Sequence, residues 1–238
     1  YPSLSEMKTI AKDRSIRRIP LCHEIMADAF TTIEVMRTLR AASHHCFLLE
    51  SAENNQPWSR YSFLGYDPLL ELTCLNGRLR IRSGEEDHMT DETIMHVTHP
   101  GIAIRKMPLE KSELPGLPPF TGGLVGYFSY DYIKYAEPTL HLDSTENADF
   151  QDVDLMLFDK LIVFDAYKQK LILIAGVRTD DLEASNERAG CEIQEMESLL
   201  KSGARAVFKP LHLETKLTPA HNEAEFSRMV EHAKHHIF

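Results

Sequence analysis

Hydrophobic residues recur at helical spacing in two segments near the start of the chain. Ser3 and Glu6 have the spacing of a capping box and precede an apolar stripe, so a short helix is predicted there. Thr31 and Glu34 repeat this spacing and predict a second helix over residues 32–42. Both helices should have defined starts, because the side chains of a capping box bond backbone N–H groups that a helix leaves unpaired.

The same helical period returns twice toward the other end of the chain. Residues 181–202 place an apolar stripe along one side, and Gly203 follows as the stop signal that a helix C-terminus favours. A last helix is predicted from Asn222, which can form a capping pair with Glu225. The sequence stops at Phe238 inside this pattern without a stop signal, so we expect the natural protein to be longer.

Between these helices, apolar runs and alternating patterns predict strands. The strongest local signal is Asn76-Gly77, a pair that readily adopts the two positive φ angles of a type I′ hairpin turn. Five prolines interrupt residues 85–119, where only a short helix over residues 102–113 is predicted. Strands are predicted over residues 19–26, 46–51, 70–75, 78–82, 121–130, 153–165 and 170–177, and Arg60 opens a further strand.

Three glycines, Gly122, Gly123 and Gly126, interrupt the strand predicted over residues 121–130. They form neither the GxGxxG nor the GK[ST] pattern of nucleotide-binding loops. Inside a strand, glycines usually mark a bulge or the close approach of another backbone. We therefore interpret these three as structural residues.

Composition excludes several classes of partner. The 238 residues carry 26 basic and 36 acidic side chains, and the net charge of −10 repels phosphate backbones and anionic lipid surfaces. No apolar run approaches the roughly 20 residues that span a bilayer, and the start lacks the apolar block of a signal peptide. The cysteines form no CxxC pair, which favours reduced thiols. We expect a cytoplasmic protein that binds neither nucleic acid nor membranes.

Two groups of reactive side chains fit ordinary structural roles better than chemical ones. His232, His235 and His236 have the helical spacing of metal ligands, but no carboxylate motif such as HExxH accompanies them, so we predict no metal site. Cys46 and Cys191 have no neighbour in the sequence that would act as an activating base. A nucleophilic role is therefore not predicted for either thiol.

The remaining candidate is the segment Leu48-Leu49-Glu50-Ser51, with Arg60 just beyond a loop. A free amino acid needs an anion for its ammonium group, a guanidinium for its carboxylate and an apolar wall for its side chain. This arrangement offers all three at adjoining strand ends. On the chemistry alone, a surface salt bridge remains the commoner explanation for such residues.

Three ordered motifs resemble the anthranilate synthase component I family. They are FLLESAENNQPWSRYSFLGYDP at residues 47–68, PPFTGGLVGYFSYD at residues 118–131 and DVDLMLFDKLIVFDAYKQKLILIA at residues 152–175. The opening YPSLSEMKTIAKD and the strand RIPLCHEIMAD extend the similarity over nearly the whole chain. The expected fold is α+β, in which a largely antiparallel sheet with covering helices forms part of the family's layered sandwich.

The resemblance implies a chorismate-utilising lyase. With magnesium and ammonia, the family aminates chorismate, eliminates pyruvate and leaves anthranilate, the first committed step of tryptophan biosynthesis. A glutamine amidotransferase subunit supplies the ammonia. In the family, chorismate, magnesium and the catalytic residues belong to the carboxy-terminal half, so the resemblance assigns no catalytic residue to this chain and implies that the chain alone is inactive.

The resemblance also implies a domain division. Residues 1–208 correspond to the amino-terminal regulatory and structural domain, and residues 209–221 correspond to a linker. Residues 222–238 correspond to the first helix of the chorismate-binding catalytic domain.

Tryptophan, the family's feedback inhibitor, binds near the LLES motif. This motif carries over to Leu49, Glu50 and Ser51, and a basic residue that opens the next strand carries over to Arg60. The resemblance therefore implies that these four residues contact tryptophan. Coupling to chorismate would need a differential affinity of about 1 to 3 kcal/mol.

Two other interpretations stay open. Aminodeoxychorismate synthase component I, an enzyme of the folate pathway, shares the fold and several of the motifs. A stand-alone amino-acid-binding module, with no enzyme attached, could use the same Glu50, Ser51 and Arg60. One departure from the family is visible, because residues 85–112 lack the long amphipathic helix that the resemblance implies there.

Overall fold

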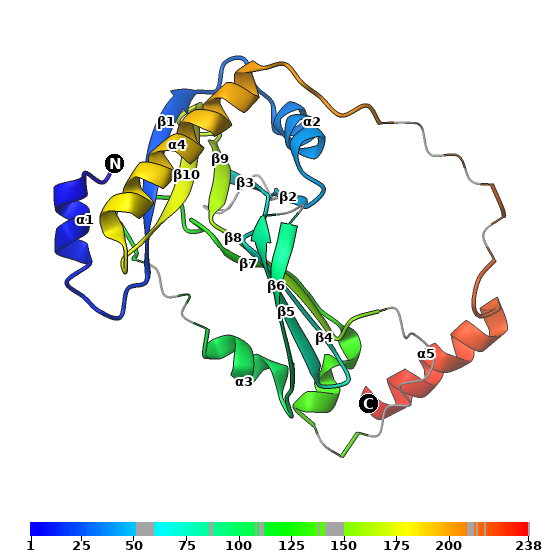
Figure 1. Ribbon diagram of the computed structural model, residues 1–238. Coiled ribbons are helices and arrows are strands. Elements are labelled where there is room, and N and C mark those ends of the chain that lie inside the picture. Colours follow the sequence, from blue (N-terminus) through cyan, green and yellow to red (C-terminus); the bar gives the residue numbers. More distant parts are fainter. Residues whose placement is uncertain are drawn as a thin grey trace. The chain divides into compact units, whose positions relative to one another are not determined.

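The chain forms two compact units, Tyr1–Ala206 and Val207–Phe238 (Figure 1). The computed structural model describes residues 1–50, 60–85, 88–107, 109, 112–137, 139–140, 150–208, 212, 214–216 and 218–237. The helices described in the first unit are α1 (Leu4–Ile10), α2 (Thr32–Ala42), α3 (Pro100–Arg105), the 3-10 helix η2 (Tyr130–Tyr135) and α4 (Leu182–Lys201).

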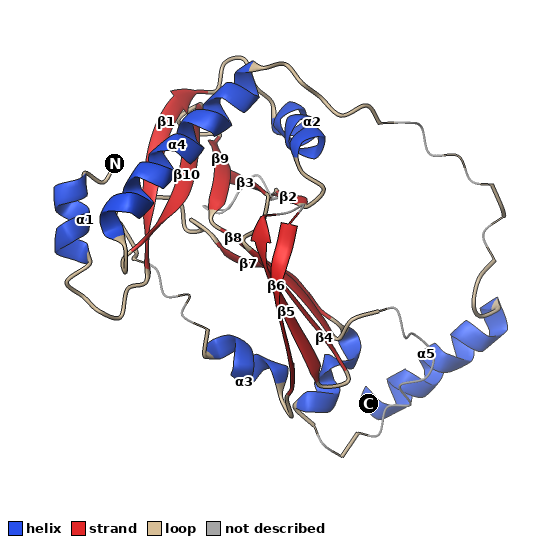
Figure 2. Cartoon of the chain, viewed as in Figure 1, coloured by secondary structure: helices blue, strands red, loops and turns tan. Residues whose placement is uncertain are grey.

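Two antiparallel five-stranded sheets form the framework of the first unit (Figure 2). Sheet A has the order β1-β10-β9-β3-β2 and contains β1 (Arg18–Met26), β2 (Cys46–Leu49), β3 (Tyr61–Tyr66), β9 (Lys160–Asp165) and β10 (Lys170–Arg178). Sheet B has the order β6-β5-β4-β8-β7 and contains β4 (Leu70–Leu75), β5 (Arg78–Glu85), β6 (His88–His96), β7 (Gly123–Phe128) and β8 (Val153–Phe158). The predicted α+β class with largely antiparallel strands is confirmed.

Helices α1, α2 and α4 cover one face of sheet A. Met7 of α1, Leu39 of α2 and Met196 of α4 are fully buried in one apolar core with Leu64 and Leu173 of the sheet. Figure 1 shows α4 lying along β10 and β1. Each large apolar side chain buried in this way contributes about 1.5 to 3 kcal/mol, so this face supplies much of the stability of the unit.

The opposite face of sheet A shares an aromatic core with sheet B. The rings of Phe47 in β2 and Phe158 in β8 meet edge to face, with centroids 4.8 Å apart. Phe63 in β3 meets Phe120, which precedes β7, in the same manner at 5.7 Å. Edge-to-face contacts favour defined ring orientations, so these pairs hold β2 and β3 in place against the second sheet.

The far face of sheet B is covered by shorter elements. Cys74 of β4 and Leu79 of β5 are buried in a core that includes Ala103 and Ile104 from α3 and Tyr132 from η2. The first unit is therefore layered, with helices over sheet A, sheet B beneath it, and α3 and η2 on the outside of sheet B.

Several local predictions are confirmed. Ser3 and Glu6 form a complete capping box at the start of α1. Asn76 and Gly77 have φ angles of 49° and 76°, as the type I′ turn between β4 and β5 requires. Gly203, at φ 71°, follows the end of α4.

Gly122, just before β7, and Gly126, within it, permit a close approach of two backbones. A Cβ atom on Gly126 would collide with the carbonyl oxygen of Asp154 in β8, and a Cβ on Gly122 would lie 2.9 Å from the carbonyl oxygen of Phe158. The interpretation of Gly122 and Gly126 as positions of close backbone approach is therefore confirmed.

Three predictions were wrong in extent or incomplete. The single strand predicted over residues 153–165 is two strands in different sheets, because the chain passes from sheet B to sheet A at Asp159. The helix predicted over residues 102–113 is α3, which begins at Pro100 and ends at Arg105. Strand β6 was not predicted, because its residues 91–96 are all exposed and carry no alternation of buried and exposed positions.

The second unit contains α5 (Glu223–Ile237). As predicted, Asn222 and Glu225 cap its start, and each side chain accepts a hydrogen bond from the other residue's N–H, at 3.1 and 3.0 Å. Phe226 and Met229 of α5 are exposed.

Among the helices that the structure describes, none is long and apolar enough to cross a bilayer. The domain division at residues 208 and 221 stays a prediction.

Candidate functional site

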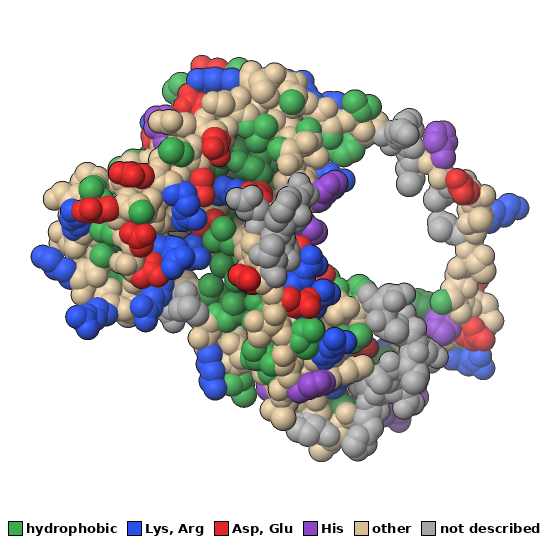
Figure 3. Space-filling view, viewed as in Figure 1, with side chains coloured by type: hydrophobic (Ala, Val, Ile, Leu, Met, Phe, Trp, Pro, Cys, Tyr) green, Lys and Arg blue, Asp and Glu red, His purple; other side chains and the backbone are tan. Residues whose placement is uncertain are grey.

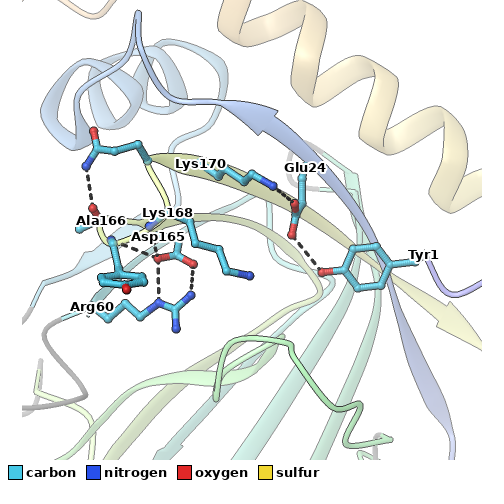
Figure 4. Close-up of polar contacts among 9 residues, drawn as sticks. Tyr1, Glu24, Arg60, Asp165, Ala166, Lys168 and Lys170 are labelled. Carbon is cyan, nitrogen blue, oxygen red and sulfur yellow. Dashed lines mark hydrogen bonds and ion pairs between the residues drawn. The ribbon is translucent and has the colours of Figure 1, made fainter.

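Arg60 and Asp165 form a bidentate ion pair at one end of sheet A (Figure 4). Arg60 directly precedes β3, Asp165 is the last residue of β9, and antiparallel pairing places Tyr61 opposite Asp165. Arg60 Nε donates to Asp165 Oδ1 at 2.8 Å, and Arg60 Nη2 donates to Oδ2 at 2.5 Å. The backbone N–H of Ala166 also donates to the carbonyl oxygen of Arg60 at 2.9 Å. Because the guanidinium fork matches both carboxylate oxygens, the pair has one favoured orientation.

The turn of residues 166–169 wraps around the carboxylate of Asp165. The N–H groups of Tyr167 and Lys168 donate to Oδ1 at 3.2 and 3.0 Å, and Asp165 is only 2% exposed. Burial alone would raise the pKa of this carboxyl. The hydrogen bonds from Arg60 and the two backbone N–H groups outweigh burial and lower the pKa of Asp165 below its ordinary value. Asp165 is therefore ionised at neutral pH.

Two tyrosine rings flank the guanidinium of Arg60. Its Cζ lies 4.8 Å from the ring centroid of Tyr61 and 5.4 Å from that of Tyr167. An arginine has five N–H donors, and Asp165 engages two of them. The other three have no hydrogen-bond partner among the residues that the structure describes. The Arg60 side chain is 32% exposed, so these donors can reach an anion from solvent.

The sequence-predicted ligand residues that the structure describes lie near this end of sheet A. Leu49 of β2 stands opposite Phe63 of β3, so the end of β2 and the start of β3 meet at the same edge. Leu49 is 48% exposed, and Glu50 is exposed directly after it. Ser51 lies outside the described residues. The roles of Leu49, Glu50, Ser51 and Arg60 in tryptophan binding stay predictions.

Asp165 and Tyr167 were not predicted from the sequence as site residues. An aspartate between a strand and a turn is a common turn former, and nothing near it in the sequence points to a ligand. Its partner Arg60 is 105 positions away, so the pairing follows only from the antiparallel register of β3 and β9. A tyrosine in the predicted four-residue turn was the one local signal in the sequence.

Neighbouring strands extend this polar edge (Figure 4). Lys170 of β10 donates to Glu24 of β1 at 2.6 Å, and the hydroxyl of Tyr1 donates to the same carboxylate at 3.4 Å. Burial and the nearby charge of Glu24 raise the pKa of Tyr1 to about 12, so this hydroxyl keeps its proton at neutral pH. Lys170 and Tyr1 therefore both bond the carboxylate of Glu24.

The described residues at this edge have the chemistry to bind a small charged ligand. Hydrogen-bond donors on Arg60, two aromatic rings and the exposed Leu49 suit a small anion or zwitterion. In the described part of the chain, no group of three or more His, Cys, Asp or Glu side chains is placed to hold a metal ion. Over the side of the first unit that carries α1 and α4, acidic and basic side chains are interspersed (Figure 3).

The chain is similar along most of its length to proteins named anthranilate synthase component 1. It is 32% identical over 182 residues to the protein of Acetivibrio thermocellus, covering 76% of this chain and 35% of that one. It is 28% identical over 243 residues to the probable anthranilate synthase component 1 of Schizosaccharomyces pombe, covering 100% of this chain and 46% of that one. The chain thus spans less than half of either relative.

The fold has a counterpart among solved structures. The crystal structure of anthranilate synthase component I from Streptococcus pneumoniae TIGR4 matches 88% of this chain and 44% of its own, with a TM-score of 0.50 and 22% identity. This likeness concerns the fold alone. A family model described as chorismate binding enzyme matches residues 44–238, and the chain therefore belongs to the chorismate binding enzyme family.

Proposed function

We propose that the chain is the amino-terminal part of an anthranilate synthase component I, a lyase that converts chorismate and ammonia to anthranilate and pyruvate. The observation that supports this most directly is the similarity to anthranilate synthase component 1 proteins over 76% to 100% of the chain. In this proposal, magnesium and the catalytic residues belong to the part of the protein outside these residues. A glutamine amidotransferase subunit supplies ammonia in the cytoplasm, for tryptophan biosynthesis.

Product analysis tests this proposal. The complete gene product is supplied with chorismate, magnesium and an ammonium salt, and anthranilate is followed by its fluorescence. We expect anthranilate from the complete product and none from the 238-residue chain alone. Formation of aminodeoxychorismate instead would assign the protein to the folate pathway. Anthranilate production by the chain alone would contradict the placement of the catalytic residues outside it.

We further propose that the Arg60 end of sheet A, with Leu49, Glu50 and Ser51, binds tryptophan as a feedback inhibitor. The support is chemical: Arg60 has unengaged N–H donors for a carboxylate, and Glu50 supplies a negative charge for an ammonium group. Leu49 adds exposed apolar surface near them. A ligand that favours one arrangement of the enzyme would lower chorismate turnover from a distance.

Calorimetry with L-tryptophan tests the site in the complete gene product. We expect Arg60→Ala to weaken binding about tenfold or more, because a charge-assisted hydrogen bond contributes about 1.5 to 3 kcal/mol. Ser51→Phe, a bulky substitution within the proposed ligand-binding motif, should weaken it as well. Arg178→Ala is the control, since Arg178 forms a bidentate pair with Asp180 at the far end of β10. Unchanged affinity in the first two variants would refute the site.

A further inference from the structure

Asp165 fixes one edge of the Arg60 guanidinium and leaves the other edge open. A guanidinium is planar, and it can present one N–H pair from Nε and Nη2 and a second pair from Nη1 and Nη2. Asp165 occupies the first pair. In Figure 4 the third nitrogen of Arg60 points away from Asp165. The open edge can therefore take a second carboxylate in the same bidentate manner.

The surroundings oppose rotation of Arg60. The carboxylate of Asp165 is itself held by the N–H groups of Tyr167 and Lys168, and the rings of Tyr61 and Tyr167 flank the guanidinium. A side chain fixed in this way loses little conformational entropy when it binds a ligand. The negative charge of Asp165 is buried at the end of β9 and paired with Arg60, so it repels an incoming anion only weakly.

We propose that Asp165 is a positioning residue, which orients Arg60 so that its open N–H edge receives the carboxylate of the amino-acid ligand. This inference rests on the proposed tryptophan site. The ligand does not touch Asp165 itself. Loss of Asp165 should therefore affect recognition of the ligand's carboxylate and leave recognition of its ammonium group and indole ring unchanged.

The chain contains a matched pair without these surroundings. Arg178 and Asp180 form the same fork, with Nε to Oδ1 at 3.0 Å and Nη2 to Oδ2 at 2.5 Å. Both side chains are more than half exposed, at 55% and 58%. This pair controls for the chemical change without the buried strand end.

The test compares L-tryptophan with tryptamine, which lacks the carboxylate, by calorimetry on the complete gene product. For Asp165→Asn we expect L-tryptophan to bind about tenfold more weakly, because an oriented charge-assisted hydrogen bond usually contributes about this much to affinity. The affinity for tryptamine should be unchanged. Asp180→Asn should leave both affinities at the wild-type value. Tyr167→Ala, which removes one flanking ring from an exposed position, should weaken L-tryptophan binding about two- to fivefold with no loss for tryptamine.

The outcomes separate this inference from the site on which it rests. If the wild-type protein does not bind L-tryptophan, the tryptophan site and the role of Asp165 both fall. If it binds L-tryptophan and Asp165→Asn binds equally well, only the positioning role is overturned. Equal losses for L-tryptophan and tryptamine would also overturn it, because they would show that Asp165 supports the fold of the pocket rather than the orientation of Arg60.

Discussion

Two buried aspartates stand at the two ends of β9 and differ in how their charges are held. Asp159 directly precedes the strand and is 4% exposed, whereas Asp165 ends it and is 2% exposed. Burial raises the pKa of Asp159, although the nearby Arg18 and Arg188 oppose this. The pKa of Asp165 is lowered, despite similar exposure.

Two things differ between these carboxyls: Asp159 lies deeper among protein atoms, so burial disfavours its charged form more strongly, and Asp165 accepts hydrogen bonds from more donors. Asp165 accepts hydrogen bonds from two N–H groups of Arg60 and from two backbone N–H groups. Asp159 accepts one from Arg18 Nη1 at 2.8 Å on Oδ2, and its Oδ1 is buried with no partner among the described residues. Burial therefore does not set the charge state of a carboxylate by itself, because hydrogen bonds to the ionised form compensate for lost hydration.

The largest expected effect is that of Asp165→Asn on stability. The amide offers one acceptor in place of two and turns an N–H group toward existing donors, so we expect a loss of about 2 to 3 kcal/mol in the free energy of unfolding. Urea denaturation of the 238-residue chain measures it. A smaller loss than that of Asp159→Asn would show that the additional hydrogen bonds of Asp165 contribute no extra stability.

Asp159→Asn should cost less, about 1 kcal/mol or below. The amide removes a buried charge that is only partly compensated, which offsets much of the lost interaction with Arg18. The same denaturation series gives the value. A cost equal to that of Asp165→Asn would mean that the unpartnered oxygen of Asp159 is not a liability.

A smaller contrast should appear in the pH dependence, with opposite signs. The lowered pKa of Asp165 gives stability that is present above its unfolded pKa, about 3.9, and is lost as the pH falls through the folded value. The raised pKa of Asp159 means that the folded state binds this proton more tightly than the unfolded state does.

The free energy of unfolding, measured at pH 7, 4 and 3 for the wild-type chain and both variants, distinguishes the effects of the two carboxyls. From pH 7 to 4, the wild-type chain should gain stability relative to Asp159→Asn. From pH 4 to 3, it should lose stability relative to Asp165→Asn. Parallel curves for the three proteins would show that neither carboxyl titrates differently in the folded and unfolded chains.

The smallest expected effect is that of Asp180→Asn. Its pair with Arg178 is exposed, and such surface pairs contribute about 0 to 1 kcal/mol. We expect a change within about 0.5 kcal/mol, and less at high salt because ions screen exposed charges. A change comparable to that of Asp165→Asn would mean that the fork geometry alone, without burial, sets the energy.

Local signals predicted local structure well. The capping box at Ser3 and Glu6 and the turn at Asn76-Gly77 were predictable, because their physical causes lie within a few residues of sequence. The passage between sheets at Asp159 was not, since only Asp159 and Lys160 separate the apolar runs of β8 and β9 and no glycine or proline marks a boundary there. Which sheet each half joins depends on partners far away in the chain.

The candidate site shows the same limit. Arg60 was found because it belongs to a motif of contiguous residues, whereas Asp165 was missed although it bonds Arg60 directly. The pairing depends on the register of β3 against β9, which no short-range pattern in the sequence specifies. The sequence therefore pointed to Arg60 and left out Asp165, the residue that forms a bidentate pair with it.

The position of β1 at the edge of sheet A has a consequence for synthesis on the ribosome. Arg18 pairs with Arg178 and Met26 with Lys170, so the first strand of the unit must wait for its last strand, β10. At about 5 to 20 residues per second, this delay lasts roughly 8 to 30 s. During this time β1 has no partner strand, and its apolar side chains lack the sheet that later buries them. Nascent chains halted before β10 emerges should therefore depend on chaperones and aggregate when these are absent.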